Sequence, residues 1–88
     1  MEFTVQVDGY LFAGVVRYCV HVAGTGISGG VTEQRTGEWS WFLRYPDGEW
    51  AGDGLAGSWE GMLHDIRGAL AMEARYGRLS YLRRDTAR

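Results

Sequence analysis

The sequence predicts a small α+β domain: an antiparallel sheet of three to five strands with one amphipathic helix packed on one face. Three observations support this fold class. Apolar and polar residues alternate in the first half of the chain, turn residues separate the alternating segments, and apolar residues recur at helical spacing after residue 58. The 88 residues have the length of one domain, spanning 1–88.

The N-terminal part of the chain predicts two strands joined by a tight turn. Residues 2–8 alternate between apolar and polar and predict a half-buried strand. Asp8-Gly9 is a favoured two-residue hairpin turn, because both residue types tolerate positive φ. Residues 10–23 predict a long strand, in which Gly14 indicates a bulge or bend, so the segment is one bent strand or two.

The middle of the chain predicts a long loop followed by an aromatic hairpin. Residues 24–37 contain five glycines and keep no period, which is typical of a long loop. Residues 38–45 alternate again and predict a tryptophan-rich strand. The Pro-Asp-Gly sequence at 46–48 predicts a turn, because proline presets φ and glycine accepts positive φ. Residues 49–52 are then a short returning strand, which a glycine-rich link follows.

One helix is predicted over residues 58–76. Ser58 suits the N-cap, where a hydroxyl accepts a hydrogen bond from a free backbone N–H, and Gly77 is a natural C-terminal stop. Between them the apolar residues that recur at helical spacing are Trp59, Met62, Leu63, Ile66, Ala69 and Leu70. Residues 78–88 are a basic C-terminal tail.

Charge is unevenly distributed, although the formal net charge is only −2. Residues 1–74 hold four arginines and ten acidic residues, a net charge of −6, and residues 75–88 hold five arginines and one acid, a net charge of +4. A basic end on an acidic body is typical of contact with an acidic partner or nucleic acid, or of a solvated terminus. One cysteine excludes an internal disulfide framework, and without an export signal or a membrane-length apolar stretch we expect a cytoplasmic protein with no membrane contact.

Two patterns have the spacing of chemical sites, but their context favours packing. Residues 24–29 match G-x-G-x-x-G, yet no amphipathic helix follows to receive a pyrophosphate at its N-terminus, so we interpret them as a hairpin loop. Cys19 and His21 share one strand face, and His64 is the only other histidine, so no repeated ligand spacing supports a metal site. We therefore expect no catalytic residue, no metal and no cofactor.

Aromatic residues are the richest feature, and the hairpin 38–52 holds three of the four tryptophans. One helix covers one face of a sheet, so we expect apolar surface on the other face, where it marks a partner interface or a homodimer contact. The alternative is that the aromatics fill both sides of a thin core. Tryptophan and arginine most often anchor interfaces, and the residues expected to bind a partner are Trp39, Trp41, Arg44, Trp50, Arg17 and Arg35.

A second function follows from a family resemblance. The residues that carry this resemblance are Trp39, Trp41, Arg44, Asp47, Gly48, Ser58 and Trp59. With them, residues 37–70 resemble the arm-type and AP2-like DNA-binding domains of phage integrases, in which a three-stranded sheet leads into one helix. The resemblance implies DNA binding through the sheet face and the basic tail, with Arg17, Arg44, Arg83 and Arg84 at the phosphates. Such domains carry many basic residues on that face, whereas here the arginines lie amid an excess of acid.

The leading hypothesis is a non-catalytic protein-binding module that covers a surface of a larger partner with the open sheet face and residues 24–37. Its small size, acidic body and lack of lysine suit a phage or mobile-element accessory protein, for example an inhibitor of a host nucleic-acid-handling complex. The alternative is a DNA-binding module of the integrase arm type, and an enzyme ranks third.

Overall fold

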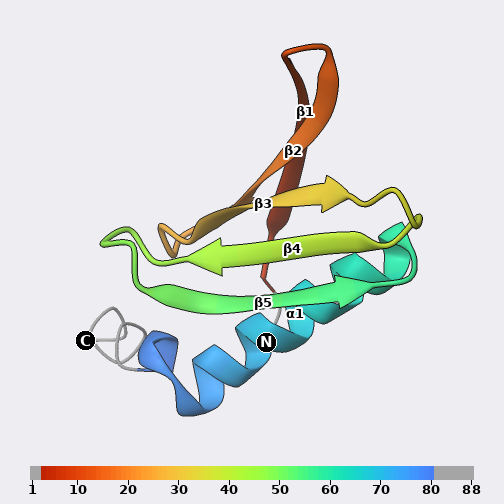
Figure 1. The fold of residues 1–88 in the computed structure, drawn as a ribbon. Coiled ribbons are helices and arrows are strands. Elements are labelled where there is room, and N and C mark those ends of the chain that lie inside the picture. The colour runs from red at the N-terminus through yellow and green to blue at the C-terminus, as the bar shows by residue number, and fades with distance from the viewer. Residues whose placement is uncertain (1–2, 81–88) are drawn as a thin grey trace.

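The computed structural model describes residues 3–80, which form a five-stranded antiparallel sheet with one helix packed on it. The elements are β1 (Val5–Phe12), β2 (Val15–Val22), β3 (Ser28–Glu33), β4 (Trp39–Arg44), β5 (Trp50–Ala56) and α1 (Trp59–Tyr76). Each strand pairs with the next one along the chain, so the sheet order is β1-β2-β3-β4-β5 (Figure 1). The predicted α+β class is confirmed.

The first hairpin turns later than predicted. Asp8-Gly9 lies inside β1, paired with β2, so the prediction of a turn there is wrong. The chain reverses at Ala13-Gly14, whose φ values of 52° and 78° are those of a two-residue hairpin turn. Gly14 therefore belongs to the turn, and the prediction of a bulge or bend inside a strand at this residue is wrong. The later turn pairs eight residues of each strand and sets their valines side by side, which favours it over the earlier one.

The predicted loop 24–37 contains a strand. Its centre forms β3, which is paired with β2 on one side and β4 on the other, so the prediction of a continuous loop is wrong. Gly29 lies where β4 approaches most closely, because a Cβ there would collide with the backbone carbonyl of Phe42. The close approach requires glycine, and glycine removes the side-chain alternation by which a strand is identified in sequence.

The second hairpin has the predicted turn at 46–48 but a longer returning strand. β5 runs through Ala56, whereas the sequence predicted a strand that ends at residue 52. Gly54 within β5 lies under the ring of Trp41, where an added Cβ would be 2.8 Å from the indole. A small residue is needed there to make room for the ring. Because glycine has no side chain, the alternation of apolar and polar residues that identifies a strand in the sequence is missing here as well.

Helix α1 begins and ends as predicted. The Ser58 hydroxyl accepts a hydrogen bond from the Gly61 N–H at 3.0 Å, and the Gly77 N–H donates to the Glu73 carbonyl at the other end. Among residues 3–80 no helix combines the length and the apolar character that crossing a bilayer requires.

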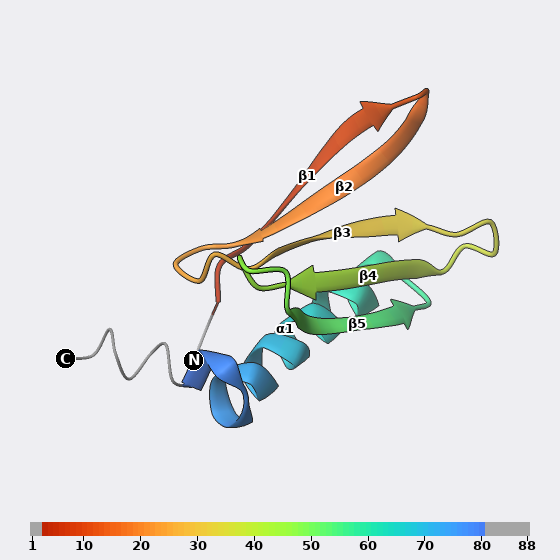
Figure 2. The ribbon, with the colours of Figure 1, turned by 60° about the vertical axis from the view of Figure 1, so that its left-hand side comes forward.

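The core lies between α1 and one face of the sheet. The helix runs along β4 and β5 on that face (Figures 1 and 2). It buries Met62, Ile66 and Leu70 completely against the sheet. The buried residues that the strands contribute are Val20, Val22, Val31, Trp41, Leu43, Ala51 and Ala56. Within the described chain no element covers the opposite face, which we call the open face.

Candidate functional site

Two groups of large apolar side chains are exposed on the sheet. The first group, Phe42, Trp50 and Leu55, lies on the open face of β4 and β5, and together with Arg44 beside it we call it the platform. The second group lies at the end of the β1–β2 hairpin, and we call it the arm: Tyr10, Leu11, Phe12, Val15 and Val16. Figures 1 and 2 show the arm projecting beyond the other strands. Exposed apolar groups of this kind mark interaction surfaces.

An aromatic and guanidinium stack forms the centre of the platform. The rings of Phe42 and Trp50 lie 5.9 Å apart between centroids with an interplanar angle of 16°. The Arg44 guanidinium carbon is 4.8 Å from the Trp50 centroid and 5.7 Å from the Phe42 centroid. Contacts at this range are cation–π interactions, and they hold three side chains in one arrangement on paired strands.

A β-bulge places Trp50 in the platform. Arg44 pairs with Trp50 and the preceding Leu43 pairs with Gly52, so Ala51 is the extra residue of β5. A bulge re-aims the side chain beside it, and here it sets Trp50 beside Arg44 on the open face while Ala51 stays buried.

Arg44 makes no direct ion pair on the platform within the described part of the chain. Among residues 3–80 the ion pairs are those of Arg78 with Asp47 and Glu49, at 2.8 Å and 2.9 Å, and Arg44 has no carboxylate partner there. Asp53 pairs with Phe42 across the strands and so lies on the same face. The platform therefore offers apolar rings, one guanidinium and a carboxylate close to them.

Two of the tryptophans predicted to bind a partner lie on the opposite side of the sheet. Trp41 is 6% exposed beneath α1, so its assignment to an interface is wrong. Trp39 is half-buried in a three-ring cluster with Tyr18 and Trp59, whose centroids lie 5.9 Å and 5.0 Å from its own. Both tryptophans share the face of the buried Leu43, so they belong to the core. For these two residues the alternative is correct that the aromatic side chains fill a thin core.

The predicted arginines are dispersed. Arg44 belongs to the platform, whereas Arg17 lies on β2 with its guanidinium 5.5 Å from the Phe12 ring of the arm. Arg35 is exposed in the segment that joins β3 to β4. Arg83 and Arg84 lie outside the described residues.

Sequence reasoning missed Phe42, Leu55 and the whole arm. The arm had a signal, since Tyr10 to Val16 is the longest apolar stretch and has a small, glycine-containing pair at its centre. Placing the turn at Ala13-Gly14 would have identified this stretch as a projecting apolar hairpin. Phe42 had a signal as well, since the alternation of β4 sets it on the same face as Arg44 and opposite Trp39 and Trp41.

The side chains with shifted pKa values tie the end of α1 to the 46–48 turn. The Tyr45 hydroxyl donates to the Glu73 carboxylate at 2.9 Å, and burial, with that hydrogen bond second, raises the pKa of Tyr45 to about 12. Arg78 donates to both Asp47 oxygens and to Glu49, and its guanidinium lies 4.5 Å from the Tyr45 centroid. The pKa of Asp47 is lowered mainly by the hydrogen bond from the Glu49 backbone N–H and, to a smaller extent, by the hydrogen bond from Arg78. This network is structural, because its members bind one another.

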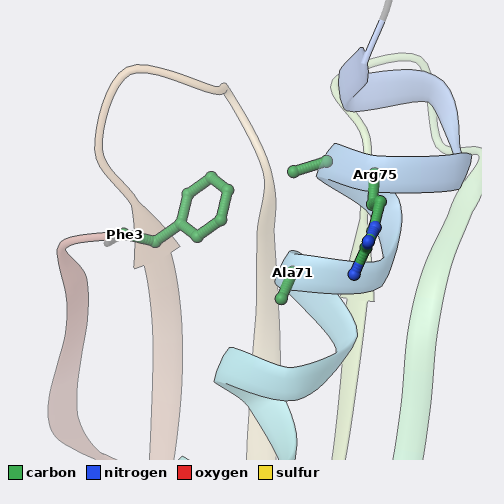
Figure 3. Close-up of a pocket in the computed structure, with 4 residues that line it drawn as sticks. Phe3, Ala71 and Arg75 are labelled. Atoms are coloured by element: carbon green, nitrogen blue, oxygen red, sulfur yellow. The ribbon is translucent and has the colours of Figure 1, made fainter. Parts of the chain in front are cut away.

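The hollows beside α1 are small. One of about 280 Å³ lies between the helix and the residues before β1 and is lined by Phe3, Ala71, Ala74 and Arg75 (Figure 3). Another of about 320 Å³ lies near the end of the helix, beside Met72 and Tyr76. Within residues 3–80 no three histidine, cysteine or acidic side chains gather as metal ligands would.

No family model, curated protein or solved structure matches this chain. The function of this chain is therefore inferred from its exposed surfaces, the platform and the arm.

Proposed function

We propose that this protein is a non-catalytic protein-binding module that docks a partner on the platform. The observation that supports this proposal is the stacked Phe42 and Trp50 pair with Arg44, exposed on the sheet face that α1 leaves uncovered. By covering a surface of a larger complex the module would act as an accessory protein or inhibitor.

The residue types and their rigidity suit an anchor. Phe42, Trp50 and Leu55 are 39%, 47% and 55% exposed, so each has apolar area left to bury on binding. Aromatic residues and arginine dominate binding energies in protein interfaces. Since the side chains stand on paired strands and contact one another, docking orders them at little entropic cost.

The charge of Arg44 specifies the chemistry of the partner. A guanidinium that stacks on aromatic rings keeps its N–H groups free to donate. Two neighbouring N–H groups can donate to the two oxygens of one carboxylate. The matching surface therefore offers an Asp or Glu side chain beside an apolar side chain that packs on Trp50.

DNA binding is the second candidate, because Arg17 and Arg44 both point from the open face. Asp8 and Asp53 lie on that face too, so its charges balance, whereas phosphate binding requires a clear excess of positive charge. The balance favours a protein partner over DNA.

The test uses two platform variants, Trp50→Ser and Arg44→Glu, with Met72→Ser as the matched control, since Met72 is 60% exposed on α1 away from the platform. Immobilised protein captures partners from a lysate of the source organism, mass spectrometry identifies them, and calorimetry with the purified partner measures Kd. We expect each platform variant to weaken binding by roughly 30-fold or more, as loss of an anchor of about 2 kcal/mol implies, and the control to bind normally.

Two outcomes contradict the proposal. Equal affinity of the platform variants and the wild type removes the platform from the interface. Retention on duplex DNA that falls steeply with salt and is lost in Arg44→Glu, without any protein partner, supports the DNA-binding candidate instead.

A further inference from the structure

The arm lies at the other edge of the sheet from the platform, and among residues 3–80 it gathers more exposed large apolar side chains than the platform does. Its exposed fractions are 48% for Tyr10, 74% for Leu11, 61% for Phe12, 53% for Val15 and 52% for Val16. At on the order of 200 Å² for each such residue, the arm exposes roughly 500 Å² of side chain, divided between the open face (Tyr10, Phe12, Val15) and the opposite face (Leu11, Val16).

β1 is an edge strand, and none of the residues 3–80 pairs with its outer side. Proteins protect edge strands with prolines, bulges, repeated charges or short length. β1 has eight residues, no proline, Asp8 as its one charge, and an unbroken register with β2. The opposite edge differs, since β5 contains the bulge at Ala51.

The backbone of β1 identifies which residues face the free edge. The Thr4 carbonyl accepts from the Ala23 N–H at 3.0 Å, and the Asp8 carbonyl accepts from the Cys19 thiol at 3.6 Å, so these carbonyls point toward β2. Backbone groups point to alternate sides along a strand. The N–H and C=O groups of Val7, Gly9 and Leu11 therefore point to the free edge.

We propose that a second copy of this chain pairs along this edge, β1 antiparallel to β1, about a two-fold axis at Gly9. In this register Leu11 lies beside Val7 of the second copy, both on the face that carries the core. Tyr10 lies beside Asp8 of the second copy on the open face. The strand is thus complementary to itself, as a two-fold interface requires.

Charge excludes one neighbouring register. Shifting the axis from Gly9 to Asp8 keeps the same faces together but sets Asp8 opposite Asp8 of the second copy, and like charges directly opposite destabilise a sheet. The register centred on Gly9 instead places each carboxylate beside a tyrosine.

Strand pairing, more than apolar area, would hold such a dimer. Backbone hydrogen bonds between the two β1 strands supply the affinity, with Leu11 packed beside Val7 of the second copy, whereas Val15 and Val16 lie on β2 and stay outside the interface. This inference is independent of the proposed function, because the platform lies at the far edge. Antiparallel pairing leaves both open faces on the same side, so a dimer presents two platforms to a partner.

Sedimentation equilibrium of the full chain over about 5 μM to 1 mM tests the proposal. We expect the mass to rise from 9.8 kDa toward twice that value with concentration. Leu11→Arg places a charge at the paired edge and should hold the protein at the monomer mass at every concentration. Leu55→Arg, at a residue 55% exposed near the other edge, is the matched control and should dimerise like the wild type.

A cysteine variant tests the register. In a Cys19→Ser background, Gly9→Cys brings two thiols together at the axis, so mild oxidation should yield a covalent dimer, while Asp53→Cys should yield none. Circular dichroism verifies that each variant is folded.

Four results overturn the proposal: a monomer up to 1 mM, a Leu11→Arg protein that dimerises as tightly as the wild type, a Leu55→Arg protein that does not dimerise, or cross-linking of Asp53→Cys in place of Gly9→Cys. If that monomer co-sediments with phosphatidylcholine vesicles through the arm, the arm is assigned to a lipid surface instead.

Discussion

Alkaline pH should destabilise this protein through one side chain, Tyr45. Its hydroxyl is buried and donates to Glu73, so the folded state holds the phenolic proton more tightly than the unfolded state does. The stabilisation is fully present below the unfolded pKa of 10.0 and is lost as the pH rises toward the folded pKa of about 12. Between these values the unfolded chain has released the proton and the folded chain has not, so the free energy of unfolding falls as pH rises.

The size of the effect follows from the shift. The pKa of Tyr45 rises by two units, from 10.0 to about 12. Each unit corresponds to about 1.4 kcal/mol, so Tyr45 accounts for a loss of roughly 3 kcal/mol once the pH has passed both pKa values, of which about 2 kcal/mol falls between pH 10 and 12. That is a large fraction of the stability of a small domain.

Urea unfolding at pH 8, 10, 11 and 12, followed by far-UV circular dichroism, measures this loss. Tyr45→Phe is the decisive control, because it removes the hydroxyl and keeps the ring. At pH 8 we expect it to be less stable than the wild type by about 1 kcal/mol, the typical contribution of one hydrogen bond. Above pH 10 the difference should shrink and then reverse. If both proteins lose the same stability between pH 10 and 12, Tyr45 does not carry the effect and the reasoning is refuted.

Three substitutions test the packing of other elements by urea or thermal unfolding. Gly68→Ala has no atom within 4 Å of the added methyl in the helix interior, so it should stabilise by about 0.8–1 kcal/mol, and a loss of stability would show that the site is not open. Gly54→Ala places a Cβ 2.8 Å from the Trp41 ring and should destabilise by about 1–3 kcal/mol; an unchanged Tm would mean that the indole does not rest there. Ser58→Ala removes the hydroxyl that caps α1 and should cost about 1 kcal/mol, whereas Ser58→Asp should retain most of the stability if capping is the cause.

Local signals were sufficient for the helix and the second turn. The Ser58 cap and the Gly77 stop act on backbone groups within a few residues, so α1 ends where the sequence predicts. The Pro-Asp-Gly turn likewise depends on the φ preferences of its own residues, and Gly48 has φ of 89° there.

Strand pairing was predicted less well because it depends on distant partners. Asp8-Gly9 has the chemistry of a turn, but the pairing of β1 with β2 placed the turn at Ala13-Gly14. β3 and the second half of β5 contain glycines where Phe42 or Trp41 comes close, and those contacts exist only in the folded chain.

The candidate site was predicted in kind but only partly in its residues. We expected an open sheet face with aromatic and arginine side chains, and Arg44 and Trp50 do lie there. Trp39 and Trp41 lie on the opposite face. The sequence did not show this, because the alternation divides the residues of β4 between two faces without indicating which face packs against the helix.

By itself the sequence determined the fold class, the extent of α1, and the turn at 46–48, because these depend on the intrinsic preferences of residues and their near neighbours. The tertiary structure alone decided that Trp41 packs beneath α1 while Phe42 faces outward, that a bulge at Ala51 turns Trp50 toward Arg44, and that the arm projects beyond the sheet. These outcomes depend on which apolar set buries more area against the single helix, and that comparison exists only once strands and helix have come together.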